Sequence, residues 1–340
     1  MGLSDWTELP KNLLDLVLQR LQLPSDYVRF SAVCMSWNSV AKDNLRRHTR
    51  LTGPPMLLTY TGKEETWNLC DMRNQKVLDF QLKLPNTRFC GFSMGWLITI
   101  DENFIVTLIE PFSKVTGRGE RKNSVVSLPR LNPPGINEGI RTVLWDKIYD
   151  FFVFKAIIST DPISNANGCI IVVTYEDSTR LAFIRLDKDT KWTYIDSNIC
   201  NITDVVYIED KLYAVDVTNR LFSFDITTSQ FNFTLVAEGF NRPGGFFKTY
   251  LVESSNHKEL LMVHRYMRYL RRRHQPRLTK KFKVFKFDAD NHKWAEINTL
   301  GDVSLFVGDS VMSVMASNFI GCLPNCIYFI HDWDRSIHRR

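Results

Sequence analysis

The hydrophobic pattern of this chain changes character at Gly53-Pro54-Pro55, and no other feature constrains the fold as strongly. Before this segment, leucines recur at the spacing of a helix. From Met56 onward, short runs rich in Val, Ile, Phe, Tyr and Trp are separated by Asp, Asn, Gly and Pro, with almost no helical period. The sequence therefore predicts a multidomain chain with a helical module over residues 1–50, a hinge over 51–56 and an all-β unit over 57–335.

The helical module should consist of three short helices. Pro10 suits the first turn of a helix that continues to Leu21, and Ser25 is a good N-cap for a second helix. A third should run from Ser36 to Leu45. Because small units hide a smaller share of their surface, some apolar surface should be left for a partner. The residues expected in the module core or at that surface are Leu9, Pro10, Leu13, Leu14, Val17, Leu18, Leu21, Val33, Cys34 and Trp37.

These residues resemble a known family, the F-box. Leu9-Pro10, the spaced leucines and Val33-Cys34-Met35-Ser36-Trp37 share its order and spacing, over about residues 5 to 48. Met35 departs from the family, which often has Lys or Arg at that place. The resemblance implies a three-helix module that docks on a Skp-type adaptor of a cullin–RING ubiquitin ligase. The alternative is an amphipathic helical cap packed on the chain's own β unit.

The all-β unit is weakly repetitive. In two places a strand ends in Asp, a short turn follows, and a Trp opens the next strand: 183–187 with 191–195, and 284–288 with 293–297. Fainter copies run from Leu221-Phe-Ser-Phe-Asp225 to Phe231 and from Leu69-Cys-Asp71 to Val77-Leu78. A strand–turn–strand unit that repeats every few dozen residues is typical of a β-propeller. We therefore expect a propeller of six or seven degenerate blades, with a β-sandwich as the alternative.

The repeats resemble kelch repeats without their paired glycines. With Ile109-Glu-Pro-Phe-Ser113 and Val126-Ser-Leu-Pro-Arg-Leu131, the arrangement over about residues 56 to 335 is more similar to the KIB-type β-propeller that follows the F-box in many plant proteins. This resemblance implies that the propeller is a substrate-binding domain and that the whole chain serves a ubiquitin ligase.

A basic segment over residues 265–286 stands out. It holds six Arg and four Lys and no acid, so the rest of the chain sums to −4 against the overall charge of +6. Pro276 and the flanking strand-like runs predict a long inter-strand loop. It could be a solvated loop, a nuclear-localisation signal, or a patch for an acidic or phosphorylated partner; nucleic-acid binding is less favoured. The cations in question are Arg271, Arg272, Arg273, Arg277, Lys280 and Lys281.

Catalytic motifs are not found in the sequence. Neither a nucleophile elbow, a zinc-protease helix nor a phosphate loop is present. Cys322 and Cys326 with His331 have the wrong spacing for a zinc knuckle, and the run 327–330 after Pro324 predicts a core hairpin instead. We therefore expect no catalysis, no cofactor and no metal.

Location can also be inferred. The seven scattered Cys suggest reduced thiols, and no signal peptide or membrane-spanning run is found. These features predict a protein of the nucleus, the cytoplasm or both.

The function that these features predict is the substrate-recognition subunit of a Skp–cullin–F-box ubiquitin ligase. The helices would bind the Skp-type adaptor and through it a cullin, and the propeller would bind a target protein for ubiquitination and degradation. One alternative is a propeller scaffold or inhibitor that acts without degradation, and another is a propeller enzyme that processes a sugar or metabolite. The sequence does not identify the target.

Overall fold

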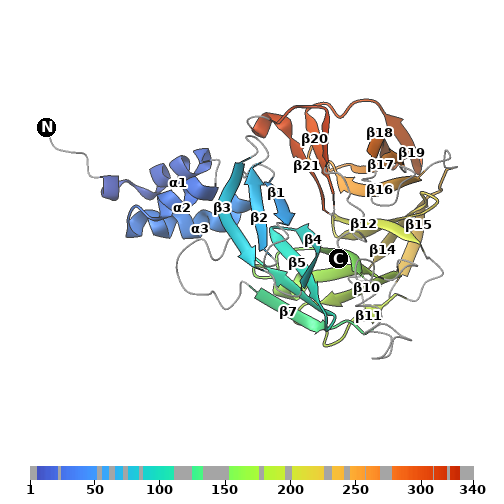
Figure 1. Cartoon of the computed structure of the whole chain (residues 1–340), viewed down its shortest axis with the longest axis horizontal. Helices are drawn as coiled ribbons and strands as arrows, with labels where there is room; N and C mark the ends of the chain where they lie inside the picture. Colours follow the sequence, from blue (N-terminus) through green and yellow to red (C-terminus); the bar gives the residue numbers. More distant parts are fainter. Residues whose placement is uncertain are drawn as a thin grey trace. The chain divides into compact units, whose positions relative to one another are not determined.

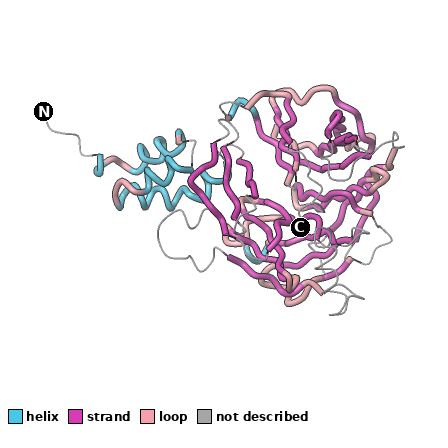
Figure 2. Tube along the Cα trace, viewed as in Figure 1, coloured by secondary structure: helices cyan, strands magenta, loops and turns pink. Residues whose placement is uncertain are grey.

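The chain folds as two compact units in a computed structural model. The first comprises Met1–Asn86, Leu108–Val126 and Asn318–Gly321, and the second comprises the remainder. Within the described residues, α-helices occur only near the start of the chain, and strands dominate from Met56 onward (Figure 2). The structure describes residues 6–21, 24–51, 56–60, 66–71, 76–83, 87–110, 125–132, 153–175, 180–195, 201–225, 232–240, 246–256, 258–268, 278–308, 310–319 and 322–329.

The first unit opens with the three predicted helices. They are α1 (Lys11–Arg20), α2 (Pro24–Ser31) and α3 (Met35–Leu51), after a 3₁₀ turn η1 (Trp6–Glu8). Pro10 lies just before α1, and its carbonyl accepts the N–H groups of Leu13 and Leu14 at 3.0 and 3.1 Å. Helix α2 begins at Pro24, so Ser25 lies inside the helix and is not its N-cap as predicted, because a helix tolerates proline in its first turn. An antiparallel sheet of β1 (Met56–Tyr60), β2 (Thr66–Asp71) and β3 (Lys76–Lys83) follows.

The following strands form five further sheets, which are the blades of a β-propeller (Figure 1). The first blade is β4 (Thr87–Ser93), β5 (Trp96–Asp101), β6 (Ile105–Ile109) and β7 (Val125–Arg130). The second is β8 (Val153–Ile158), β9 (Ile170–Tyr175), β10 (Arg180–Arg185) and β11 (Thr193–Tyr194). The third is β12 (Ile202–Ile208), β13 (Lys211–Asp216), β14 (Leu221–Asp225) and β15 (Asn232–Ala237). The fourth is β16 (Phe246–Glu253), β17 (Leu260–Arg268), β18 (Leu278–Asp288) and β19 (Lys293–Ile297). The fifth has three strands, β20 (Val303–Val307), β21 (Val311–Met315) and β22 (Cys326–Phe329).

The innermost strands pack in the order β4, β8, β12, β16 and β21. Two hydrogen bonds hold β21 in place: Ser313 Oγ donates to the Glu253 carbonyl of β16 at 2.5 Å, and the Phe92 N–H of β4 donates to Ser310 Oγ at 2.7 Å. The fifth blade therefore closes the ring onto the first, and the predicted count of six or seven blades is wrong. Leu69–Asp71, which the sequence suggested as a repeat, contributes to the separate sheet of the first unit.

The Asp–turn–Trp repeats are the third and fourth strands of successive blades. They correspond to β10–β11 and β18–β19, and the degenerate copy to β14–β15. In both full copies the indole N–H donates to a carbonyl of the preceding blade: Trp192 to Pro129 at 2.7 Å and Trp294 to Asn219 at 3.1 Å. The repeat therefore predicts the propeller correctly because its tryptophan fastens one blade to the next.

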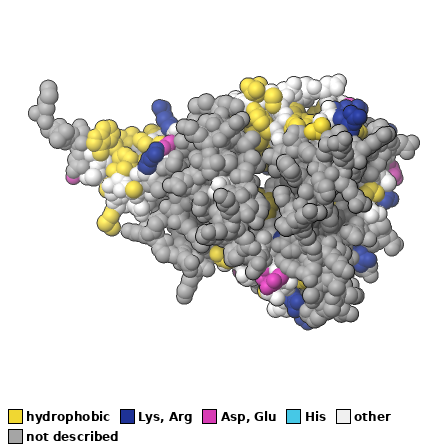
Figure 3. Space-filling model, viewed as in Figure 1, with side chains coloured by type: hydrophobic (Ala, Val, Ile, Leu, Met, Phe, Trp, Pro, Cys, Tyr) yellow, Lys and Arg dark blue, Asp and Glu magenta, His cyan; other side chains and the backbone are white. Residues whose placement is uncertain are grey.

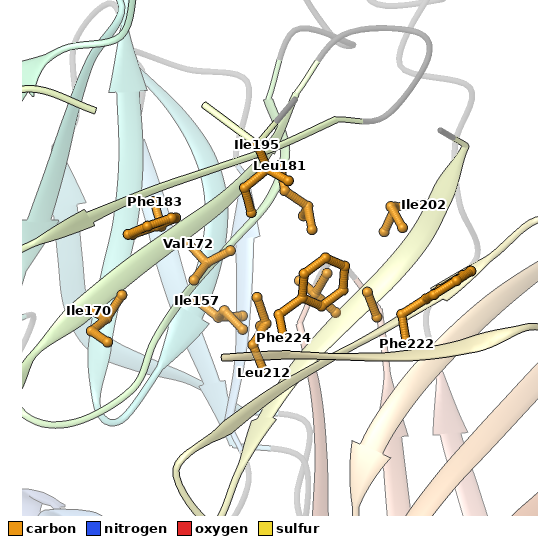
Figure 4. Packing of buried hydrophobic residues seen from close by; sticks show 12 residues of the cluster. Ile157, Ile170, Val172, Leu181, Phe183, Ile195, Ile202, Leu212, Phe222 and Phe224 are labelled. Carbon is orange, nitrogen blue, oxygen red and sulfur yellow. The ribbon is translucent and has the colours of Figure 1, made fainter. Parts of the chain in front are cut away.

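Apolar clusters fill the spaces between neighbouring blades. The cluster between the second and third blades is formed by side chains that alternate along β8–β10 and β12–β14 (Figure 4). Fully burying one such side chain contributes about 1.5–3 kcal/mol. Its members are Ile157, Ile170, Val172, Leu181, Phe183, Ile195, Ile202, Val205, Leu212, Ala214, Phe222 and Phe224.

Gly91, Lys155 and Asp204 occupy corresponding places near the start of three innermost strands, each just after a shift in strand register. At Gly91 a Cβ atom would lie 2.2 Å from the Ala156 carbonyl oxygen, so only glycine lets β4 approach β8 this closely. Lys155 Nζ lies 2.5 Å from Asp204 Oδ1, and Asp204 Oδ2 accepts the Leu251 N–H at 2.6 Å. This buried ion pair therefore connects β8, β12 and β16.

The C-terminal strand corrects another expectation. β22 pairs in parallel with β20, so the run after Pro324 is not part of a hairpin. Asn325 Oδ1 accepts the Leu300 N–H at 2.8 Å, and Ser304 Oγ donates to the Leu323 carbonyl. These contacts hold the segment before β22 next to the residues where β20 begins, so β22 runs beside β20 in the same direction.

Candidate adaptor interface

The helical module has a small core. Leu14 and Leu18 of α1 are fully buried, together with Phe30, Val40 and Ala41. Partly buried side chains of Leu9, Leu21 and Trp37 pack against this core. The ring centres of Trp37 and Phe30 lie 4.5 Å apart, and the indole N–H of Trp37 donates a hydrogen bond to the Trp6 carbonyl at 2.9 Å. Trp37 therefore holds the module together.

Polar contacts join the helices around this core. Asn44 of α3 donates to Asp15 Oδ1 of α1 at 2.6 Å, and Asn38 donates to the Ser31 carbonyl at 2.8 Å. Lys11 and Asp43 form an exposed ion pair at 2.6 Å, and this hydrogen bond raises the pKa of Lys11. An ion pair this open to solvent adds little stability. The packed leucines and the Asn44 bond thus fix α1 against α3.

A second apolar surface of the module faces solvent. The exposed fractions are 41% for Leu13, 55% for Leu16, 38% for Val17, 51% for Val33 and 83% for Met35, and we call these five residues the apolar stripe. Leu13, Leu16 and Val17 share one side of α1, about a third of a turn from the buried Leu14 and Leu18. In Figure 3 hydrophobic side chains gather on the helices. Exposed apolar side chains grouped in this way on one side of a helix favour a surface that binds another protein.

The structure divides the ten residues that the sequence singled out. Leu14 and Leu18 are core residues, with Leu9, Leu21 and Trp37 at its margin. The exposed ones are Pro10, Leu13, Val17 and Val33, and Cys34 is half-buried. Leu16 and Met35 belong to the apolar stripe but were absent from the predicted set. Leu16 widens the apolar side of α1 in the sequence, whereas Met35, the first residue of α3, was noted in the sequence only as a departure from the family motif.

The described ends of the basic segment, residues 265–268 and 278–286, lie on strands, which corrects the predicted loop at these positions. β17 extends to Arg268 and pairs with β18 from Leu278 onward. Arg265 is fully buried. Its Nε–H donates to Thr279 Oγ1 at 2.8 Å, and its guanidinium carbon lies 5.0 Å from the centre of the Phe329 ring. Lys280 and Lys281 are exposed on β18. The other four predicted cations, Arg271, Arg272, Arg273 and Arg277, lie outside the described residues.

Metal and thiol chemistry has little support in the described part of the chain. Those residues contain no group of three His, Cys, Asp or Glu side chains that could hold a metal ion. Cys322 and Cys326 are free thiols, and His331 lies outside the described residues. Burial raises the pKa of Cys169 to about 11, so this thiol stays protonated and unreactive at neutral pH. Across the described ranges, none of the helices is long and apolar enough to cross a membrane.

These observations define an F-box protein with a β-propeller. The family model described as F-box-like matches residues 6–52, which include all three helices. The model for the KIB1-4 beta-propeller matches residues 68–339. The chain belongs to the KIB1-4 beta-propeller family, and the resemblance drawn from its sequence is confirmed.

Relatives from Arabidopsis thaliana match nearly the whole of this chain. An Arabidopsis thaliana protein named as a putative F-box protein, At3g25750, is 28% identical over 97% of this chain and 88% of its own length. The F-box protein SKIP23 of the same plant is 26% identical over 95% of this chain and 82% of its own.

Among solved structures, the N-terminal domain of Nup159 covers 79% of this chain and 62% of its own, at 8% identity and a TM-score of 0.36. The β-propeller domain of Cps50 (Swd1) from Myceliophteria thermophila covers 75% of this chain and 76% of its own, at 13% identity and a TM-score of 0.33. Likeness this weak supports no inference about function.

Proposed function

We propose that this chain is the substrate-recognition subunit of a Skp–cullin–F-box ubiquitin ligase. The observation that carries the proposal is the apolar stripe, which lies within the residues of the F-box-like match and takes no part in the module core. The stripe would bind a Skp-type adaptor and, through it, a cullin. The propeller would bind the target protein. The domains proposed from the sequence are the helical module over 1–50, the hinge over 51–56 and the all-β unit over 57–335, within which the five described blades begin at Thr87.

The mechanism is proximity and requires no catalytic group in this chain. Tethering the target beside a charged ubiquitin-conjugating enzyme raises the effective concentration of target lysines at the reactive thioester. The chain contributes two binding surfaces and a scaffold that holds them in one molecule. The rigid, closed set of blades is suited to this task because its surface loops can vary without loss of the core.

Adaptor capture by the purified full chain tests the proposal. The variant Leu13→Ala, Leu16→Ala, Val17→Ala removes three side chains of the stripe while leaving Leu14 and Leu18 in place. The matched control removes three exposed apolar side chains of the second unit, through Phe233→Ala, Leu235→Ala and Leu323→Ala. We expect the wild type and the control to capture the adaptor and the stripe variant to lose capture with its melting curve preserved. No capture by the wild type would contradict the proposal.

The proposed location is the nucleus, the cytoplasm or both, where adaptor and target would be encountered. A fluorescent fusion of the full chain tests this. Arg271→Ala, Arg272→Ala, Arg273→Ala should shift the fusion toward the cytoplasm if those arginines serve as an import signal. An unchanged distribution would contradict the hypothesis that these arginines serve as an import signal.

A further inference from the structure

The cations of the basic segment separate into two groups along the β17–β18 strand pair. Near the middle of the pair, three of the described cations have structural partners. Lys283 lies 2.8 Å from Glu296, Lys286 lies 2.6 Å from Glu259, and the buried Arg265 is held by Thr279 and Phe329. The buried Arg265 is therefore not available to a partner, and each of the two lysines is already paired with an acid.

The far end of the same strand pair is different. Arg268, Lys280 and Lys281 are exposed, and none of the ion pairs among the described residues involves them. From residue 268 to residue 281 the sequence holds seven Lys and Arg and no Asp or Glu, so acids close in sequence cannot neutralise them. We call Arg268, Lys280 and Lys281 the cationic end.

Strand register brings these cations together. Lys281 pairs with Tyr266, and Arg268 lies two residues beyond Tyr266 on the same face of the sheet. The register shifts between Tyr266 and Met267, which leaves Lys280 as an extra residue without a cross-strand partner. The Lys281 ammonium lies 5.1 Å from the centre of the Tyr266 ring, a contact that limits its freedom.

Arg268 and Lys281 lie on one face of the sheet, and no ion pair described in the structure includes either of them. An anion bound at the cationic end would therefore meet cations that are not already paired with an acid. Because the chain outside 265–286 sums to −4, the positive potential is local. A long nucleic acid would meet net negative surface beyond this patch, whereas a short anionic segment would not.

We propose that the cationic end binds an acidic segment of a partner protein, with carboxylate or phosphate groups as the recognised chemistry. Arg268 offers a planar fork of donors, and the two lysines add point charges beside it. If the partner is the target of ubiquitination, this inference names the chemistry of that target and in that respect rests on the proposed function. Binding itself does not depend on ligase assembly.

Fluorescence anisotropy of the full chain with short labelled peptides tests the proposal. The probes are a glutamate-rich peptide, a phosphoserine peptide, and a glutamine-rich peptide of the same length. The variant is Arg268→Glu, Lys280→Glu, Lys281→Glu. The matched control is Lys188→Glu, Lys191→Glu, Lys211→Glu, which makes the same change of net charge at exposed lysines of the second and third blades.

We expect the wild type and the control to bind an anionic peptide and not the glutamine-rich one, and the variant to bind at least about tenfold more weakly. Stronger binding of the phosphoserine or of the glutamate-rich peptide decides which anion is recognised. Equal loss in variant and control, no binding by the wild type, or tighter binding of single-stranded RNA than of either peptide would overturn the proposal. Adaptor capture, measured on the same samples, should be unchanged in the variant. If the ligase role is wrong, the wild type will not capture the adaptor, whatever the result of the peptide titration.

Discussion

Leu13 and Leu14 offer a matched test of how α1 divides its two apolar sides. The two leucines are adjacent, and their N–H groups bond to the same Pro10 carbonyl. Leu14 is fully buried, whereas 41% of Leu13 is exposed. Replacing either with alanine removes the same atoms with the same change of helix propensity. Any difference between Leu13→Ala and Leu14→Ala therefore reports where each side chain lies.

The expected magnitudes differ clearly. Leu14→Ala leaves a cavity and should cost about 3–5 kcal/mol, whereas Leu13→Ala should cost about 1 kcal/mol. A module the size of residues 6–51 has a stability on the order of 2–7 kcal/mol, so Leu14→Ala should unfold much of it. Leu13→Ala should leave it folded but weaken adaptor binding by about 1–2 kcal/mol, or about 5- to 30-fold.

Hydrogen exchange is the appropriate assay because a chain of two units need not unfold in one step. Protection of the α1 and α3 amides should collapse in Leu14→Ala and persist in Leu13→Ala. Calorimetric titration with the adaptor should show weak binding by Leu13→Ala despite its protected helices. Loss of protection in Leu13→Ala equal to that in Leu14→Ala would refute the division into core and surface.

Three further predictions concern the propeller. Gly91→Ala should lower the melting temperature because its Cβ would meet the Ala156 carbonyl at 2.2 Å, and an unchanged melting curve would contradict the close approach of β4 and β8. Asp204→Ala should cost about 3–5 kcal/mol in denaturant unfolding because it removes the carboxylate that binds both Lys155 and the Leu251 N–H, and Lys155→Met with Asp204→Leu should recover only the part of that loss that comes from the unpaired Lys155. Burial raises the pKa of the Glu253 carboxyl in the folded state. The contribution of this group to stability is therefore fully present below the carboxyl pKa of the unfolded chain, and it is lost as pH rises through the raised pKa of the folded chain. Glu253→Gln should therefore raise the melting temperature more at pH 7 than at pH 4, and an equal effect at both would disprove this linkage.

The sequence predicts most of the fold where local pattern and tertiary packing agree. The leucine spacing predicts α1 because its apolar sides repeat at the helical period. The Asp–turn–Trp repeat predicts the β10–β11 and β18–β19 pairs because its turn connects the two strands and its Trp indole bonds to the preceding blade. In these places each local preference matches the final structure.

The rest depends on contacts between distant residues. The blade number depends on β21, which follows β20 in sequence yet takes the innermost place beside β16 and β4. The sequence did not predict the long strands of the basic segment because Arg265 is buried among partners distant in sequence, which include Thr279, Tyr250 and Phe329. The division of the stripe from the core likewise depends on where α2 and α3 pack against α1, which helical spacing alone does not determine.

The most direct test of the central claim is the hydrogen-exchange footprint of a Skp-type adaptor on the full chain, read by mass spectrometry. We predict that the adaptor slows exchange in α1 around Leu13–Val17 and at the α2–α3 connection around Val33–Met35, with the five blades unchanged. Protection confined to the blades, or no protection at adaptor concentrations that saturate an established F-box protein, would contradict the proposal that the apolar stripe is the adaptor interface.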